Sequence, residues 1–421
     1  MAHRTLLSDG ITKLLDRHFG IIPECVIYEG AVLTFLELPS DCTEFANAIF
    51  ANDPGLKDVF SVEDIFRRIA SVIITIVREG TCRKDDLIES LCTRLEQSDE
   101  AKLVLIPLQG IALIEPVTQI GPFRLRLMND EAIAEAIGLW NAAIDRTTNT
   151  SDEKAAFKDW HAKEFESDLR GCVSIEVRVS GDVKRAETIA VQQATALIDI
   201  LRYGSSGLHH KSLNLAIGFK GDGVPGIYRR YVLPLGVSDA TIPSFRTGPF
   251  GTLVINSDSL RVMSDLGVQK LAGILQRPTS QFEAAVMRAV HWFAESRMQT
   301  RPEDEVMTLA IAIEAALAVP GQQNHGRNVL AEVVAVLLSD EAAERTRVFG
   351  LTRAALWNRG DVVHQGVDSL EWDDLKNFRN VVLAFIAATI HSTERFHTTA
   401  ELHSWVASKH SGLVKTKMNA P

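Results

Sequence analysis

Two residues in the segment Leu351 to Gly366 have side chains suited to chemistry on a phosphodiester, and they lie five positions apart. Arg359 carries a permanent positive charge and a planar fork of donors that matches phosphoryl oxygens. His364 can accept or donate a proton near neutral pH. A fixed cation beside a proton-transfer group is what metal-independent cleavage of RNA requires. A purely structural interpretation also applies, because arginine and histidine near a helix end interact well with its negative dipole.

The residues before this pair predict a helix that ends just where the pair begins. Apolar side chains recur at close to helical spacing, namely Leu351, Ala354, Ala355 and Trp357. Polar side chains are expected on the opposite side of this helix, namely Thr352, Arg353 and Asn358. A short polar break follows, in which Gly360 loosens the helix and Gly366 closes the segment. We therefore expect Arg359 and His364 to lie in a break at the end of a helix.

The chain around this segment is helical in pattern from about residue 280 onward. Pro278 ends the preceding helix, and Thr279 or Ser280 can cap the next one. Pro302 is a strong helix start, with the acids Glu303, Asp304 and Glu305 favoured in the first turn by the helix dipole. The predicted helices are 281–298, 302–319, 327–338, 340–359 and 369–393.

Three further stretches accompany the segment, namely T-L-A-I-A-I-E-A-A-L from Thr308, L-A-E-V-V-A-V-L-L from Leu330 and E-R-T-R-V-F from Glu344. With R-x4-H followed by glycine in a helical domain, residues 280–395 resemble the HEPN nucleases, and most closely their Apea-like group. The segment departs from many HEPN motifs in having Gly360, where a polar residue often follows the arginine. The resemblance implies an all-α HEPN-like helical bundle.

The resemblance also implies that Arg359 and His364 cleave RNA, usually across a dimer interface. The supporting polar group is either Asn358 or Asp361, and the sequence does not decide between them. Glu314 lies in an apolar run, and a partly buried carboxylate needs a partner, for which Arg353 and Arg359 are the candidates. We assign Glu314 a structural role first and a catalytic one second.

In this scheme the ribose 2′-hydroxyl attacks the phosphate, so neither a metal nor a cofactor takes part. His364 transfers a proton, Arg359 holds the phosphoryl oxygens, and a second histidine comes from the partner of a homodimer. The products are a cyclic phosphate and a free 5′-hydroxyl. Family likeness adds prokaryotic defence against phage, with the N-terminal portion sensing a phage-derived trigger. The alternative from another class is a non-catalytic dimerisation, nucleotide-binding or protein-binding module.

The N-terminal portion, residues 1–275, has the mixed pattern of an α+β region of one or two subdomains. Helices are predicted at 6–19, 43–50, 61–78, 83–97, 130–144 and 182–201. Strands are predicted within 25–38 and 101–128 and at 172–179, 213–219, 228–235 and 252–256. Arg124 and Arg126 alternate with apolar residues, which favours a polar sheet face over a phosphate site. Residues 279–410 form the predicted helical domain, and 411–421 a disordered tail.

Composition restricts the partners that the chain can have. The 421 residues carry a net charge of −10, and the region 279–410 has 12 Lys/Arg against 17 Asp/Glu. This balance disfavours bulk binding to nucleic acid and suits a selective nuclease better than a coating protein. No apolar run is long enough to span a membrane. The five cysteines lack C-x-x-C spacing, so we expect reduced thiols in a cytoplasmic protein.

Overall fold

The computed structural model describes most of the chain from residue 102 onward and a few residues before it. The described residues are 46–47, 60–66, 68, 102–145, 150–180, 183–208, 217–221, 228–231, 244–247, 252–277, 279–299, 301–321, 326–365 and 372–418. Within these, only the backbone is described at 228–231, 244–247, 359–365, 372 and 410–418. The predicted elements at 6–19, 25–38 and 83–97 fall outside the described residues.

The chain divides into two compact units, residues 1–104 with 177–192 and residues 105–176 with 193–421. In the first unit, Ser61 caps a short helix, because its Oγ accepts a hydrogen bond from the Asp64 backbone N–H at 3.1 Å. Arg68 forms an ion pair with Asp64 at 2.5 Å and lies over the Phe60 ring. The predicted helix start at Ser61 is therefore confirmed.

Five strands form one sheet in the order β3-β4-β5-β1-β6. Their bounds are β1 Lys102–Gln109, β3 Val117–Ile120, β4 Phe123–Leu127, β5 Val173–Val179 and β6 Gly218–Phe219. The pairs β3–β4, β4–β5 and β1–β6 are antiparallel. Strand β4 alternates as predicted, with Phe123 and Leu125 in the core.

The two arginines of β4 pair with acids within the second unit. The register sets Arg124 opposite Glu176, and their side chains form an ion pair at 3.0 Å. Arg126 reaches Glu176 at 3.4 Å and Glu135 at 2.6 Å, and its side chain is only 12% exposed. The polar face of β4 is therefore largely covered by ion pairs within the second unit, and only part of it is open to solvent.

Two helices stand between β4 and β5, whereas only the first was predicted. They are α6, Asp130–Asp145, and α7, Ser151–Leu169, and they pack against each other. Helix α7 begins with a capping box, since Thr150 and Glu153 each bind the other's backbone N–H. It escaped prediction because only Leu169 of its residues is buried, so that no apolar stripe marks it. After β5 comes α8, Val183–Ser205, close to its predicted position.

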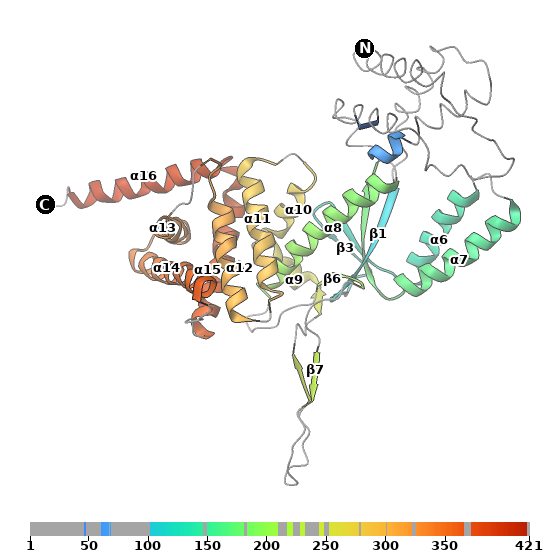
Figure 1. The fold of residues 1–421 in the computed structure, drawn as a ribbon, viewed down its shortest axis with the longest axis horizontal. Helices are drawn as coiled ribbons and strands as arrows, with labels where there is room; N and C mark the ends of the chain where they lie inside the picture. The colour runs from blue at the N-terminus through green and yellow to red at the C-terminus, as the bar shows by residue number, and fades with distance from the viewer. Residues whose placement is uncertain are drawn as a thin grey trace, which may run out of the picture. The chain divides into compact units, whose positions relative to one another are not determined.

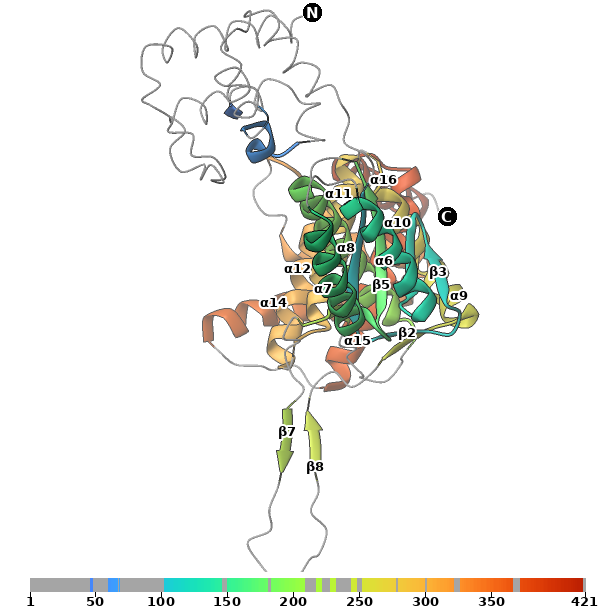
Figure 2. The ribbon, with the colours of Figure 1, turned by 90° about the vertical axis from the view of Figure 1, so that its right-hand side faces the viewer.

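Shorter elements connect this sheet to the helical region. Strand β2, Ile111–Leu113, pairs in parallel with β9, Leu253–Ile255. Strands β7, Tyr228–Tyr231, and β8, Ser244–Thr247, form an antiparallel ribbon (Figure 2). Helices α9, Ser257–Asp265, and α10, Val268–Ile274, follow.

Glycines allow two close approaches that position these short helices. Gly121, in the β3–β4 turn at φ 55°, would place an added Cβ 2.6 Å from the Cβ of Ala272 on α10. Gly267, between α9 and α10 at φ 82°, would place one 2.5 Å from Cγ2 of Ile390. Both positions combine left-handed backbone with no room for a side chain, so only glycine fits.

The C-terminal region is entirely helical (Figure 1, yellow to red). Its main helices are α11 Gln281–Ser296, α12 Pro302–Leu317, α13 Arg327–Leu338, α14 Ala342–Gln365, α15 Trp372–His391 and α16 Thr399–Met418. Helices α12, α14 and α15 pack on one another, α11 on α12 and α13 on α14. Phe282, Phe293, Phe378 and Phe385 are fully buried and fill this bundle.

The predicted fold class is confirmed: an antiparallel sheet with helices is followed by an all-helical region at 257–409. The five predicted C-terminal helices are all present, whereas α16 was not predicted. Its backbone is helical as far as Met418, into the stretch expected to be a disordered tail. Among the described helices, none is both long and apolar enough to cross a membrane.

Candidate functional site

The segment that holds Arg359 and His364 is helical throughout. Helix α14 continues to Gln365, so the predicted break at Arg359 and the loosening at Gly360 are wrong. A single glycine costs about 1 kcal/mol in a helix, which the packing of α14 against α12, α13 and α15 can outweigh. The two positions are therefore separated by helical geometry, about 7.5 Å along the axis and about 140° around it.

The predicted faces of α14 are also wrong in part. Thr352 and Asn358, expected on the polar side, are 0% and 4% exposed. Trp357, expected on the apolar side, is 50% exposed, and Ala354 is exposed as well. Only Ala355 lies in the core as predicted. The observed faces differ from the predicted ones because the packing of α12, α13 and α15 decides which side of α14 is buried. That side carries small polar residues, and the large indole lies in solvent.

The described side chains of the predicted site lie on two helices that pack together, α12 and α14. Glu314 is half-buried on α12, and Asn358 is buried on α14. Arg353, one of its two candidate partners, is exposed. The side chains of Arg359, Asp361 and His364 lie outside the described part of the structure.

Helical periodicity relates the two motif positions to described neighbours on α14. Position 359 comes one turn after Ala355, which belongs to the inward stripe of described side chains. Position 364 comes two turns after Trp357, which belongs to the outward stripe of described side chains. One copy of the helix therefore presents the two positions on different faces.

Trp357 marks the outward stripe with an aromatic surface. The guanidinium of Arg327, at the start of α13, lies over the Trp357 ring with its carbon 4.5 Å from the ring centroid. An exposed indole with a stacked guanidinium is a surface on which nucleic-acid bases stack. The sequence offered no signal for it, because it placed Trp357 in the core.

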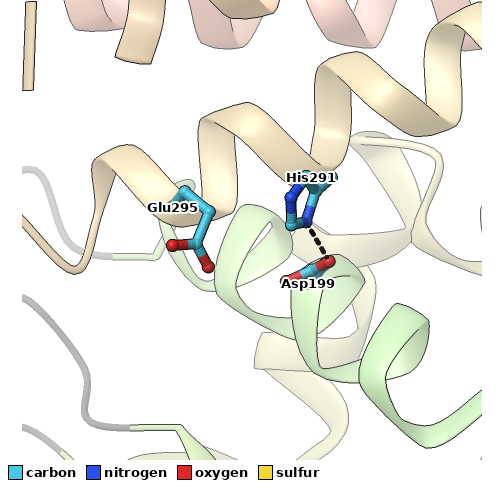
Figure 3. A group of neighbouring side chains, drawn as sticks. All are labelled: Asp199, His291 and Glu295. Atoms are coloured by element: carbon cyan, nitrogen blue, oxygen red, sulfur yellow. Dashed lines mark hydrogen bonds and ion pairs between the residues drawn. The ribbon is translucent and has the colours of Figure 1, made fainter. Parts of the chain in front are cut away.

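A second group of side chains, not singled out from the sequence, joins α8 to α11. The Nδ1 of His291 lies 2.8 Å from Oδ2 of Asp199, and Glu295 follows one turn later on α11 (Figure 3). Asp199 is buried, whereas the His291 side chain is 48% exposed. The hydrogen bond to Asp199 is the main reason why the pKa of His291 is raised above its ordinary value.

Asp199, His291 and Glu295 each offer a ligand atom within 4.8 Å of the others, a spacing that a metal ion can use. Arg202 already lies among them, with Nη1 at 3.3 Å from Glu295 Oε1 and 3.6 Å from Asp199 Oδ1. The guanidinium of Arg202 already neutralises these carboxylates, as a bound metal ion would. We therefore interpret the group as an ion-pair network between two helices.

The raised pKa of His291 predicts a pH-dependent contribution to stability. A group whose pKa is higher in the folded state stabilises the fold fully below its unfolded pKa and loses that effect as the pH rises through the folded value. The unfolding free energy lost on replacing His291 with Gln should therefore be larger at pH 5.5 than at pH 8.5, by urea denaturation. In an Asp199→Asn background, the effect of His291→Gln on the unfolding free energy should differ less between the two pH values. If the pH dependence stayed the same, the hydrogen bond to Asp199 would not be its cause.

A third group is buried inside the helical region. The carboxylate of Glu305 on α12 accepts a hydrogen bond from Arg297 Nη1 at 3.1 Å. It also accepts two from Arg379 on α15, from Nε at 2.6 Å and Nη2 at 2.8 Å. The side chains of Arg297 and Glu305 are each 7% exposed. The sequence marked Glu305 only as a first-turn acid, because its partners lie 8 and 74 positions away.

Comparison of the chain with models of protein families, with curated proteins and with solved structures found no match.

Proposed function

We propose that the chain is a metal-independent endoribonuclease of the HEPN type, with Arg359 and His364 as its catalytic pair. The observation that carries the proposal is the position of R-x4-H at the C-terminal end of α14, within an all-helical region in which α14 packs on α12, α13 and α15. In this scheme Arg359 neutralises charge on the phosphoryl oxygens while His364 moves a proton to or from the ribose 2′-oxygen or the leaving 5′-oxygen.

The helical course of α14 supports a site shared between two copies of the chain. Because positions 359 and 364 fall on different faces of one helix, a single copy presents them poorly to one phosphate. In a two-fold dimer, a residue of one protomer that contacts a different residue of its partner does so twice by symmetry, so Arg359 of each copy can meet His364 of the other. A pair of histidines in such a dimer also supplies both an acid and a base.

The exposed Trp357 supports RNA as the substrate. Its ring lies beside Arg327, and Trp357 precedes position 364 by two turns of α14. Single-stranded RNA offers unstacked bases that bind aromatic rings and guanidinium planes. This local surface allows RNA to bind although the net charge of the chain is −10.

The chemistry of the attack gives the direct test. Purified protein should cleave single-stranded RNA and leave a cyclic phosphate and a 5′-hydroxyl, since the nucleophile is the neighbouring 2′-oxygen. The matched DNA strand should stay intact, and so should RNA in which a single 2′-deoxynucleotide precedes the cleaved bond. End-group analysis of labelled oligonucleotides measures both. Equal cleavage of DNA would contradict the scheme.

The second candidate function is a non-catalytic module that dimerises or binds a nucleotide or protein. The continuous helix through Gly360 favours it, because this helix does not set the two motif positions side by side within one copy. Expression in a bacterial host separates the two functions. Growth arrest that disappears with His364→Ala supports the nuclease, whereas dimers that neither arrest growth nor cleave RNA with any phage-derived trigger support the module.

A role in prokaryotic defence against phage completes the proposal, with the portion before the helical region as the sensor. The α6–α7 hairpin in that portion exposes large apolar side chains, namely Leu139, Trp140, Phe157 and Trp160. Exposed apolar groups of this size are typical of surfaces that bind other proteins. We expect a phage-derived protein to bind to this exposed surface.

A further inference from the structure

A cavity of about 290 Å³ opens beside the buried Glu305 network, and the described residues that line it come from outside α14. Arg297 and Arg379 line it together with Lys376, one turn before Arg379 on α15. Ser206, just after α8, adds a hydroxyl. Apolar side chains complete the wall, among them Leu266 and Leu383. The lining therefore combines three cations with an apolar surface, and none of the described residues that line it carries a carboxylate.

Among the described residues that line this cavity or bind its guanidiniums, positive charge exceeds negative charge. Glu305 supplies one negative charge behind the two guanidiniums, and Lys376 adds a third positive charge. Two positive charges therefore remain. Burial, followed by repulsion from Arg379, lowers the pKa of Arg297 to about 10, but this guanidinium stays charged at neutral pH. An anion in the cavity would offset the repulsion.

The guanidiniums of Arg297 and Arg379 also have N–H donors that do not bind Glu305. Each has five N–H donors, of which Glu305 accepts one from Arg297 and two from Arg379. Neither guanidinium has a nitrogen that is both fully buried and without a partner, so the remaining donors are not sealed in the protein. Donors that line a cavity suit a ligand with several acceptor oxygens.

A larger cavity in the described part of the helical region lacks this property. It measures about 650 Å³ and is lined by two cations, Lys270 and Arg277. Each already has a carboxylate in the same lining, since Lys270 pairs with Glu394 and Arg277 with Glu283. Its charges cancel, and it therefore gives no reason to expect an anion.

We propose that the Arg297–Lys376–Arg379 cavity binds the phosphate group of a small phosphorylated molecule, such as a mononucleotide. A phosphate monoester carries close to two negative charges at neutral pH, which matches the two positive charges left by Glu305. Its oxygens suit the forked donors of arginine, and Lys376 at the exposed rim contributes a third contact. The apolar wall accommodates the non-phosphate part, and the volume lies near the lower end for ligand pockets. This site is independent of the proposed RNA cleavage.

Calorimetric titration of the full chain, without RNA, tests the site. The probes are inorganic phosphate, uridine monophosphate, uridine and succinate at one ionic strength. We expect saturable binding of uridine monophosphate, weaker binding of phosphate and none of uridine. If phosphate alone binds as tightly as the nucleotide, the ligand is free phosphate. Binding of succinate in preference to both would overturn the phosphate assignment, and so would the absence of any binding.

Three variants make the test specific to the cavity. Lys376→Gln removes a rim charge from an exposed position, so the fold should survive, and binding should weaken by about tenfold because one charge-assisted hydrogen bond is lost. Arg379→Lys keeps the charge and loses the fork, and should weaken binding as well. Arg261→Gln removes the same charge from an exposed site on α9 outside the cavity. Equal weakening by Lys376→Gln and Arg261→Gln would show non-specific attraction and refute the site.

Discussion

Replacing His364 with alanine should lower the rate of RNA cleavage by about 10²–10⁴-fold, the contribution of a positioned proton-transfer group. Arg359→Ala should lower it by about 10²–10³-fold, as for the loss of one donor to developing charge. Initial rates on a labelled oligoribonucleotide measure both effects. The matched control is Arg353→Ala, which removes an exposed arginine from the same helix and should leave cleavage unchanged. His364→Ala with the rate of the parent chain would exclude the pair as the catalytic centre.

Mixing the two inactive variants tests whether each site is shared between protomers. In a dimer of one Arg359→Ala chain and one His364→Ala chain, one of the two composite sites regains both residues. Random mixing should then restore at most about a quarter of the parent activity, since half of the dimers are mixed and each has one site with Arg359 and a single His364, without the second histidine. If each protomer used its own pair, the mixture would stay inactive. The helical spacing of positions 359 and 364 in α14 leads us to expect restoration.

Replacing Glu305 with alanine should lower the free energy of unfolding by about 3–5 kcal/mol, because it leaves two guanidiniums facing each other without their carboxylate. The side chains of Arg297, Glu305 and Arg379 are all largely buried, so solvent can replace that carboxylate only in small part. Chemical denaturation followed by circular dichroism measures the change, and calorimetric unfolding shows whether the helical region melts separately.

The neighbouring Glu303 gives a matched control on the same helix. Its carboxylate lies 3.6 Å from an exposed arginine, Arg301, and Glu303→Ala should therefore change stability far less than Glu305→Ala. Restoring part of the loss by adding Arg379→Met to Glu305→Ala would confirm that buried positive charge without its carboxylate, and not lost packing, destabilises the single variant. Similar losses for Glu303→Ala and Glu305→Ala would contradict the buried network.

Local sequence determined most of the helices and several strands of this protein. Apolar spacing and strong caps predicted α11 to α15, because Ser280 and Pro302 favour one backbone start whatever surrounds them. Strand β4 was legible from its alternation alone. By contrast, α7 has a capping box but almost no buried face, so hydrophobic periodicity could not reveal it.

Only the tertiary structure decided which charged and aromatic side chains meet. Glu305 lies 74 positions from Arg379, and Asp199 lies 92 from His291, so no local pattern relates these partners. The faces of α14 depended on its neighbours, which bury Thr352 and Asn358 and leave Trp357 in solvent. Its continuation through Gly360 depended on them too, since the packing of a helix can outweigh the low propensity of one residue. Sequence thus determined which segments are helical, and packing decided which residues those helices bring together.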